Sequence, residues 1–516
     1  MSKPLRVVLV KPSKYGTDGL VERFRRGFMP NSTLPYLESL TPRRLGGRSV
    51  EVHAFDEYVE TDLGYLSWLR RDPGCRTLVA LVGVQSHQLQ RALDLAAYAR
   101  AAGVEGCVIG GPHPMTCDTS VLQGRGVSFA LGEAELLWAS ILADALEGEL
   151  RPVYGAETRW QRELAAPVLE PPSPRRLRRY VVPMLGVYPA RGCPFSCSFC
   201  SVIKIAGRQV RSQPVETTLA SLRKAKAAGV KLIMFTSDNF NKYADAGPLL
   251  EAMIAERIEL PFFVQCDTQI AAQGGLVELL ARAGCFQMFV GAESFSRPAL
   301  LAVNKGHNRP ERYRDIVRAC REHGITSHFS NILGFPTDTE AGILEHLRTL
   351  MELDPDVASF YVLTPIPGTE QYAELLAAGR ICETDLDRFD GACPTWRHPC
   401  LGPEQLRGLL FRCYREFYAW GRVSRRLLRQ LGRRDFRTGA AVFAVAGHAA
   451  LARHAARRGT HPMAGGVGRV GRDARSDYLA LRRDRYGLER VPLPAVLELS
   501  PGDREINRQA RLGVPA

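Results

Sequence analysis

The chain has 516 residues, which is too long for one ordinary domain and predicts two or three. Its apolar content of 45% and charged content of 24% are typical of globular proteins. Thirteen cysteines in a chain this long are not a secreted disulfide framework. No apolar signal region follows Met1 and no stretch reaches 18 apolar residues, so we expect a cytoplasmic protein without a transmembrane segment.

Strand-like and helical segments alternate over the first 150 residues. Apolar runs predict strands at residues 5–10, 78–84, 104–109 and 129–131, and apolar periodicity predicts helices at 86–102 and up to 145. This alternation is typical of a parallel, doubly wound sheet, whose ligands bind beyond the carboxyl ends of the strands. That edge carries Ser13, Gln85, Ser86, His87, Gln88, Gly110 and Gly111.

Three cysteines follow the next predicted strand, at residues 185–188. Cys193, Cys197 and Cys200 have the spacing C-x3-C-x2-C. A [4Fe–4S] cluster is normally held by four thiolates, so three leave one iron open, which is typical of an enzyme rather than an electron carrier. The alternatives are unliganded thiols or a zinc site, which would need a fourth ligand. The nearest later candidates for that ligand are Cys266 and Cys285.

Strand-then-helix units continue after the cysteine loop. We expect strands at residues 231–236, 262–266, 286–290, 327–332 and 358–363. Each ends in polar or glycine residues, where (β/α) barrels assemble their active sites. Glu293 ends one of these strands and either contacts a cofactor or pairs with an arginine such as Arg297. His328 lies within another and is either a substrate acid or base or a satisfied core histidine.

Positive charge is concentrated at the C-terminal end. Residues 421–516 contain 20 Arg, no Lys and 8 acidic residues, so they carry +12 of the net charge of +14. One interpretation of this charge is a tail that binds anions or contacts a membrane surface. The other, which we favour, is a solvated helical appendage. Residues 439–451 form an apolar helix too short to span a bilayer. It rests on a membrane or a lipid-like substrate or, as we favour, packs on the catalytic domain.

The cysteine motif, the strand endings and the sheet before them resemble the radical S-adenosylmethionine (SAM) family with a cobalamin (B12)-binding domain, the class B radical SAM methyltransferases. The resemblance runs from about Leu5 to Trp420. It implies an α/β fold with an N-terminal Rossmann-like cobalamin-binding domain followed by a (β/α)6-type partial TIM barrel. The implied boundaries are 1–150 for the cobalamin-binding domain, 151–180 for a linker, 181–385 for the barrel and 386–516 for a helical, Arg-rich C-terminal region.

The same resemblance implies roles for individual residues. Cys193, Cys197 and Cys200 would bind a [4Fe–4S] cluster, whose open iron chelates SAM. Glu293 and His328 are the candidate catalytic residues. The residues expected to contact SAM are Phe199, Ser237, Asp238, Asn239, Glu293 and Gly334.

Cobalamin is the second implied cofactor. Its expected contacts are Ser13, Gln85, Ser86, His87, Gln88, Gly110 and Gly111. The Asp-x-His-x-x-Gly stretch that supplies a cobalt ligand in methionine-synthase-type domains is missing, because residues 11–16 read KPSKYG. We therefore expect base-off cobalamin without a protein histidine on cobalt, and His87 and His113 are the nearby alternatives.

The implied function is methylation of a carbon atom in a small molecule, such as a specialised metabolite, through methylcobalamin formed from SAM. The alternatives are non-methylating chemistry (cyclisation, ring contraction or rearrangement) and polar methyl transfer to an sp2 carbon without a radical. A cluster- or B12-dependent sensor that binds nucleic acid is disfavoured, because the tail lacks a helix-turn-helix. We expect an electron donor such as flavodoxin or ferredoxin and no nucleic-acid partner.

Overall fold

The first sheet forms because its central strand is buried on both faces. In the computed structural model, which describes residues 3–458 and 465–512, β1 (Leu5–Lys11) is buried along its whole length. It pairs in parallel with β4 (Arg48–Asp56) and β5 (Arg76–Leu81), and the strand order is β3-β4-β1-β5-β6-β7-β8. The other strands are β3 (Arg44–Leu45), β6 (Gly106–Gly110), β7 (Ser128–Ala130) and β8 (Val153–Tyr154).

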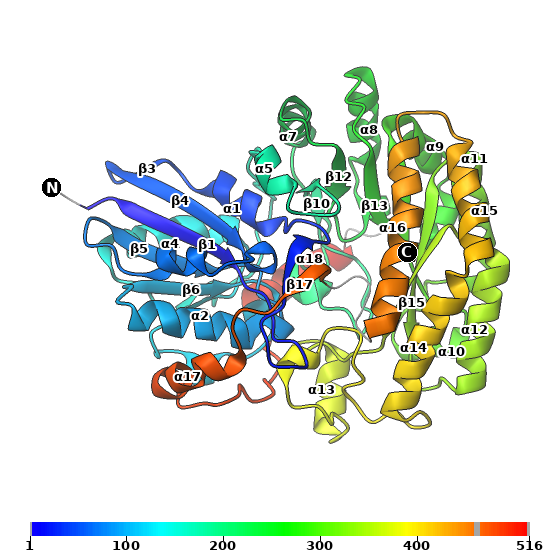
Figure 1. Ribbon diagram of the computed structural model, residues 1–516. Helices are drawn as coiled ribbons and strands as arrows, with labels where there is room; N and C mark the ends of the chain where they lie inside the picture. The colour runs from blue at the N-terminus through cyan, green and yellow to red at the C-terminus, as the bar shows by residue number, and fades with distance from the viewer. Residues whose placement is uncertain (1–2, 459–464, 513–516) are drawn as a thin grey trace.

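Helices cover both faces of this sheet (Figure 1). α2 (Leu89–Ala101) packs on one face, and α1 (Thr33–Leu40) and α4 (Ala134–Glu147) cover the other. The short helix α3 (Pro112–Thr116) follows β6. The doubly wound, mainly parallel sheet expected from the alternating pattern is therefore present, with its polar loops at the carboxyl edge of the strands.

The sequence missed three strands of this sheet, the short β3, β4 and β8. β4 is only partly buried and alternates apolar with charged residues, so it lacks the continuous apolar run that marks β1. β8 pairs with β7, and it lies beyond the predicted domain boundary at residue 150. That boundary was therefore wrong, because the sheet continues to Tyr154.

Six parallel strands form the second sheet, in the order β16-β15-β14-β13-β12-β9. Within the described residues its edge strands β9 (Met184–Val187) and β16 (Val357–Val362) are not paired with each other, so the barrel is partial. Between them lie β12 (Leu232–Phe235), β13 (Phe262–Cys266), β14 (Cys285–Glu293) and β15 (Thr326–Leu333). The helices that follow the strands are α7 (Val215–Ala227), α8 (Ala246–Ala255), α9 (Gly274–Ala283), α10 (Arg297–Ala302), α11 (Tyr313–Glu322), α12 (Glu340–Leu353) and α13 (Glu370–Ala377).

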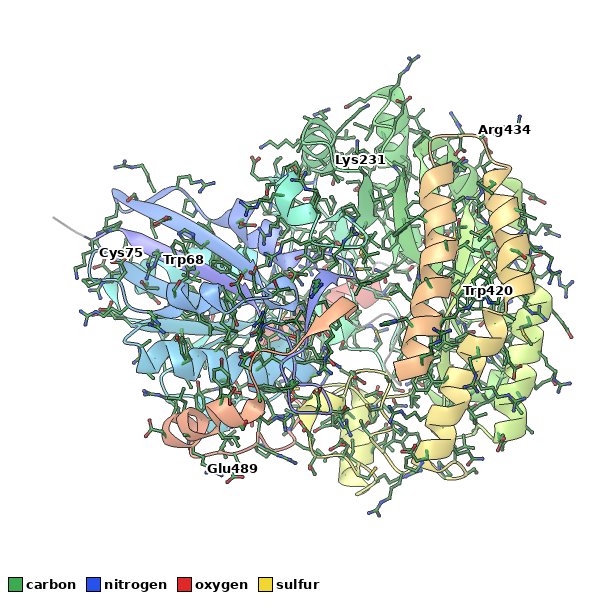
Figure 2. The ribbon with its side chains drawn as sticks, in the orientation of Figure 1. Trp68, Cys75, Lys231, Trp420, Arg434 and Glu489 are labelled. Carbon is green, nitrogen blue, oxygen red and sulfur yellow. The ribbon has the colours of Figure 1, made fainter. Side chains whose placement is uncertain are left out.

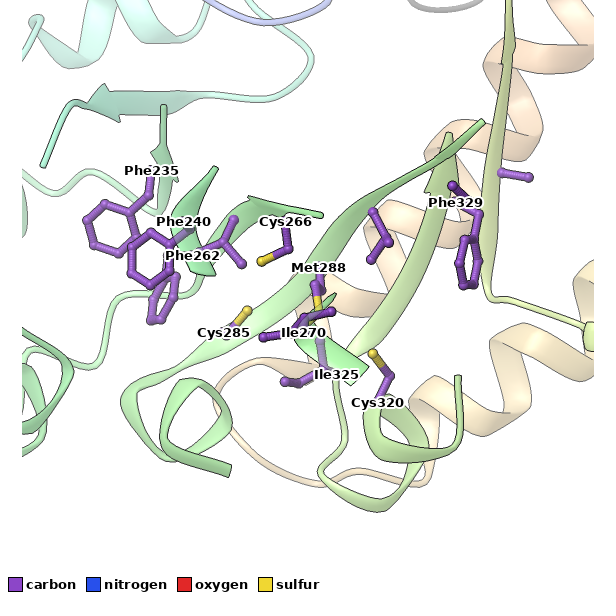
Figure 3. Close-up of a cluster of buried hydrophobic side chains, with 14 of the residues drawn as sticks. Phe235, Phe240, Phe262, Cys266, Ile270, Cys285, Met288, Cys320, Ile325 and Phe329 are labelled. Carbon is purple, nitrogen blue, oxygen red and sulfur yellow. The ribbon is translucent and has the colours of Figure 1, made fainter. Parts of the chain in front are cut away.

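Alternate strand residues point into the core between the barrel and its helices. Figure 3 shows Phe235, Met288 and Phe329 from three strands in this cluster. Cys266 and Cys285 lie in the same apolar core, where both are buried. Neither is available as a fourth ligand to the cysteine loop.

Three helices of the C-terminal region cover the barrel: α14 (Pro403–Phe417), α15 (Trp420–Leu431) and α16 (Thr438–Arg458). Tyr414 and Tyr418 direct their hydroxyls to backbone groups of β16, which fixes this layer on the barrel. Trp420, labelled in Figure 2, is 75% exposed on the outer side. The apolar helix packs on the catalytic domain as predicted, since Ala444 of α16 contacts the barrel core.

Beyond residue 465 the chain returns to the first domain, which the sequence did not predict. β17 (Gly466–Val470) pairs antiparallel with β2 (Arg23–Gly27), and α17 (Leu479–Tyr486) packs on α2, as Figure 1 shows at lower left. The last helix is α18 (Pro501–Leu512). Arg482 is fully buried and pairs with Asp94, so this part of the tail is not a solvated appendage. None of the described helices is both long and apolar enough to cross a membrane.

Candidate functional site

A short strand pair and a glycine shape the loop that carries the three cysteines. β10 (Ala190–Arg191) pairs antiparallel with β11 (Arg211–Ser212), and the loop runs between them. Gly192 has φ +106°, and a Cβ atom there would lie 2.1 Å from the Gln209 carbonyl oxygen, so a side chain does not fit. The Gly192 N–H donates to Asp238 Oδ2 at 2.8 Å, which ties the loop to the end of β12.

The three thiols lie in a largely desolvated environment. Burial raises the pKa of Cys193 to about 11 and that of Cys200 to about 12, and it also raises the pKa of Cys197. Since iron binds thiolates, metal binding must displace these protons. The Lys305 ammonium acts in the opposite direction to burial on Cys197 and Cys200. It is placed to offset the negative charge of thiolates bound to a cluster.

The donor set fits an iron–sulfur cube better than a single ion. Within residues 3–458 and 465–512, no three His, Cys, Asp or Glu side chains converge closely enough to hold one metal ion. A structural zinc site needs four converging ligands. In a [4Fe–4S] cluster each thiolate binds a different iron, so the cysteines are spread apart. Three cysteines in one loop, without a fourth converging ligand in the part of the chain that the structure describes, match a cluster that leaves one iron open.

Glu293 ends β14 with a positive φ of 65° and is held by two neighbours. Its Oε1 lies 3.3 Å from Lys305 Nζ, and its Oε2 accepts from Ser330 Oγ at 3.0 Å. Arg297, the partner considered from the sequence, donates instead to the backbone carbonyls of Gly306 and Asn308. The arginine pairing was therefore wrong, and the cation beside Glu293 is Lys305.

Lys305 is the residue of this site that the sequence reasoning missed. Besides Glu293, its ammonium lies over the Phe199 ring, 5.6 Å from the centroid. Burial alone would lower the pKa of Lys305, but the charges of Glu293 and the neighbouring thiols raise it. No spacing rule links a lysine in a loop after α10 to a cysteine motif a hundred residues earlier.

The three residues after β12 differ in what they contact. Asp238 accepts the hydrogen bond from Gly192 described above. Asn239 exchanges hydrogen bonds with Asp267 after β13, and its Nδ2 is 4.0 Å from Cys193 Sγ. Ser237 Oγ is buried and has no hydrogen-bond partner among the described residues, which is a free polar group of the kind that a bound ligand would satisfy. Asp238 and Asn239 thus lie beside the cysteine loop.

Gly334 lies in a turn that a carboxylate organises. Its φ is +85°, and Asp338 Oδ2 accepts from the N–H groups of Gly334 and Phe335, both at 2.9 Å. Burial raises the pKa of Asp338 to about 6. Phe335 and Phe199 belong to one apolar cluster, so this turn lies close to the cysteine loop.

His328 lies deeper in the barrel, away from the residues around the cysteine loop. Gln287 Nε2 lies 2.6 Å from its Nδ1, and Ser359 Oγ lies 2.7 Å from its Nε2. Burial keeps the pKa of His328 well below its usual range, so the ring is neutral. Both ring nitrogens are hydrogen-bonded to barrel side chains. His328 is therefore a core histidine with its hydrogen bonds made, which is one of the two alternatives considered from the sequence.

A chamber of about 600 Å³ lies between the carboxyl edge of the first sheet and the mouth of the barrel. Its polar lining from the first domain includes Lys11, Lys14, Gln85, His87 and Gln88, and its lining from the barrel includes Tyr188, Met234 and Thr236. Burial lowers the pKa of Lys11 to about 8, and Lys11 Nζ donates to Gln88 Oε1 at 2.5 Å. Burial, together with the charge of Lys14, lowers the pKa of His87 to about 3, so His87 is neutral.

A second cavity, of about 260 Å³, continues from this chamber into the first domain. Gly110 and Gly111 line it, and Thr33, Tyr188 and Thr236 line both spaces. Gly111 has φ +135°, and a Cβ atom there would lie 2.2 Å from the backbone nitrogen of Val84. Gly111 is therefore required by the packing of the chain itself, in addition to any ligand.

The two serines expected at the cobalamin site, Ser13 and Ser86, line neither cavity. Ser13 is fully buried, its N–H donates to Glu57 and its hydroxyl donates to the Glu22 carbonyl oxygen. Ser86 Oγ lies 2.9 Å from His113 Nδ1, and both residues are buried. His113 is thus held by Ser86, which leaves His87 as the histidine at the chamber wall.

Comparison with known proteins agrees with this arrangement. Residues 187–350 match the model of the Radical SAM superfamily. The bacteriochlorophyllide d C-8(2)-methyltransferase of Chlorobaculum tepidum is 26% identical over 67% of this chain and 80% of its own length. The C-12(1)-methyltransferase of the same organism is 27% identical over 62% and 70%.

A solved structure shares the fold. The radical S-adenosylmethionine methyltransferase TsrM from Kitasatospora setae, with cobalamin and a [4Fe–4S] cluster bound, has a TM-score of 0.58 at 16% identity. The match covers 89% of this chain and all of that one. At this identity the likeness establishes the order and packing of the two α/β domains.

Proposed function

We propose, from the radical SAM domain in this chain and its methyltransferase relatives, that the protein is a cobalamin-dependent radical SAM methyltransferase. It transfers a methyl group from SAM, by way of cobalamin, to a carbon atom of a small molecule. The observation that carries this proposal is the continuous space from the first domain to the barrel mouth, beside the three-cysteine loop. When bound there, the cluster with SAM supplies a carbon-centred radical and cobalamin supplies a transferable methyl group.

The residues of the two domains divide the binding between them. Cys193, Cys197 and Cys200 would hold the cluster, and Ser237 offers its unpartnered hydroxyl to SAM. The 260 Å³ cavity would take the nucleotide tail of cobalamin, and the 600 Å³ chamber would take its corrin ring together with the substrate. Within this arrangement Glu293 is a candidate SAM contact, and its charge is balanced by Lys305.

The protein contributes positioning and the exclusion of water. Asp238 holds Gly192 and hence the start of the cysteine loop, and Asp338 fixes the turn at Gly334. His328 acts as a positioning residue in the barrel wall, because both of its ring nitrogens are already bonded. The reduced cluster needs a one-electron donor, which we expect to be a flavodoxin or ferredoxin in the cytoplasm. The thirteen cysteines are all unpaired, which agrees with a reducing compartment.

The test is anaerobic reconstitution with iron, sulfide and hydroxocobalamin, followed by measurement of iron, cobalamin and methyl transfer from methyl-labelled SAM. We expect about four irons per chain and one cobalamin, and loss of the iron in a Cys197→Ala variant. A cluster without cobalamin would contradict the methyltransferase mechanism. Formation of 5′-deoxyadenosine without methyl transfer would favour cyclisation or rearrangement, and methyl transfer without 5′-deoxyadenosine would favour the polar route.

A further inference from the structure

A small cavity lies toward the amino ends of the barrel strands, on the side of the proposed active-site chamber that faces away from the barrel mouth. It has a volume of about 80 Å³. Phe28 and Met29 line both this cavity and the chamber. Leu232 on its wall is two residues before Met234, which lines the chamber, so the two spaces follow each other along one face of β12. The small cavity is therefore the inner end of the space that a substrate can occupy.

Helix α16 closes this inner end. Four of its residues face the cavity, and the barrel supplies a mainly apolar wall opposite them. The lining residues from α16 are Phe443, Ala444, Gly447 and His448, and the apolar barrel residues are Met184, Leu232, Phe263, Phe286 and Phe289.

His448 presents one unpartnered atom to this apolar surrounding. Its Nδ1 lies 2.7 Å from the Ala444 carbonyl oxygen, so Nδ1 carries the proton and donates. Burial lowers the pKa of His448, so the ring is neutral and Nε2 is a lone-pair acceptor. Nε2 is buried and has no hydrogen-bond partner among the described residues. Such an atom costs free energy unless a ligand donates to it.

The other polar side chains on the wall are already satisfied. His328 stands edge to face with His448, with their ring centroids 4.9 Å apart. It is bonded to Gln287 and Ser359, so neither of its nitrogens is free for a ligand. No Lys, Arg, Asp or Glu among the described residues lines the cavity. A charged group would therefore be desolvated there without a counter-ion.

We propose that the cavity receives the uncharged, apolar end of the substrate, and that this end carries one hydroxyl or N–H that donates to His448 Nε2. This inference rests on the proposed function, because it treats the chamber above as the methylation site. His448 is then the residue that sets substrate specificity at the distal end. Carboxylates and phosphates are excluded from this end, and a hydrocarbon without a donor leaves Nε2 unsatisfied.

The probes that test this are phenol and toluene, which differ by the hydroxyl in place of the methyl group. Their dissociation constants are measured by calorimetry or ligand-observed NMR on the protein loaded with cluster and cobalamin. We expect phenol to bind at least about tenfold more tightly than toluene. A His448→Phe variant should lose this preference, and His448→Gln, which keeps an acceptor, should recover part of it.

Two further variants locate the binding. His454→Phe changes the exposed histidine on the same helix and should leave the phenol-to-toluene ratio unchanged. Gly447→Leu should abolish the binding of both probes, because a Cβ atom at Gly447 has room, 3.8 Å from the Phe443 ring, while the rest of the side chain fills the cavity. Equal affinities for the two probes in the wild-type protein, or an unchanged ratio in His448→Phe, would overturn the proposal.

Failure of this inference is distinguishable from failure of the proposed function. Iron content, cobalamin content and transfer of labelled methyl are measured on the same preparations and do not depend on phenol. A loaded enzyme that binds neither probe contradicts the distal site alone. A protein that binds phenol selectively but takes up no cobalamin contradicts the methyltransferase instead.

Discussion

Arg211 and Glu133 form a two-pronged ion pair that joins the two domains. Arg211 on β11 donates from both terminal nitrogens to Glu133, which precedes α4 of the first domain, at 2.7 and 2.8 Å. Both side chains are almost fully buried. Because β11 closes the cysteine loop, this pair fixes the cluster loop relative to the sheet edge that faces it.

Replacing Arg211 by methionine should therefore destabilise the protein strongly. The change leaves the buried Glu133 carboxylate without its main partner, which costs about 3–5 kcal/mol in the free energy of unfolding. Urea denaturation measures the loss. Arg223→Met is the matched control, since Arg223 pairs with Glu216 and Glu256 on the surface and should change little. Equal effects of the two variants would contradict the role assigned to the interdomain pair.

The carboxyl of Asp338 should make stability depend on pH in a defined window. Burial raises its pKa from 3.8 to about 6, so the folded state holds the proton more tightly than the unfolded state. The contribution of Asp338 to the free energy of unfolding is therefore fully present below pH 3.8, and it is lost as the pH rises through about 6.

An Asp338→Asn variant removes this dependence while keeping an oxygen acceptor for Gly334 and Phe335. Because the side chain is partly exposed, we expect the variant to gain about 1–2 kcal/mol relative to wild type at pH 8 and less at pH 5. Urea midpoints at the two pH values measure this. A difference that is the same at both would show that ionisation of Asp338 is not responsible.

Apolar runs and the cysteine spacing were enough to predict the parts of the fold that are buried on both faces. β1 and β5 appear where continuous apolar stretches predict them, and the strand endings at Asp238 and Glu293 lie around the cysteine loop. In a parallel sheet covered by helices, local sequence reports burial directly.

Long-range pairing was not predictable in the same way. β17 has a glycine-rich sequence without an apolar run and exists because it pairs with β2, more than 400 residues earlier. Lys305 belongs to the site only because folding brings it to Glu293. Ser13 does not line the chamber, because its N–H donates to Glu57 and its hydroxyl donates to the Glu22 carbonyl oxygen. These pairings and contacts depend on which distant segments meet in the folded chain, and the local sequence pattern does not predict that.

Lys305 should tune the cluster that the cysteine loop would bind. A cation beside Cys197 and Cys200 stabilises the more negative, reduced state of a cluster, so Lys305→Met should lower its reduction potential. A redox titration of the reconstituted protein followed by EPR measures this. Lys231→Met, at the exposed surface position labelled in Figure 2, is the control and should leave the potential unchanged. A potential that does not move in Lys305→Met would place the ammonium too far from the irons.

His87 is the histidine at the chamber wall, and we expect it not to bind cobalt. A His87→Ala variant should then bind cobalamin in the same amount as wild type, with the same base-off visible spectrum. The comparison is made after reconstitution with hydroxocobalamin. A shifted spectrum together with reduced cobalamin would instead make His87 a cobalt ligand.

The returning C-terminal segment should stabilise the first domain through Arg482. This side chain is fully buried between α17 and α2 and bonds both oxygens of Asp94 as well as Gln90. Replacing Arg482 by methionine leaves the buried Asp94 carboxyl without its arginine partner, so we expect a loss of about 3–5 kcal/mol in the free energy of unfolding. Arg483→Met removes the next arginine of the same helix, which pairs with Glu489 at the surface, and should have little effect. If urea denaturation finds the two variants equally stable, the segment after residue 465 is an accessory to the first domain rather than part of its fold.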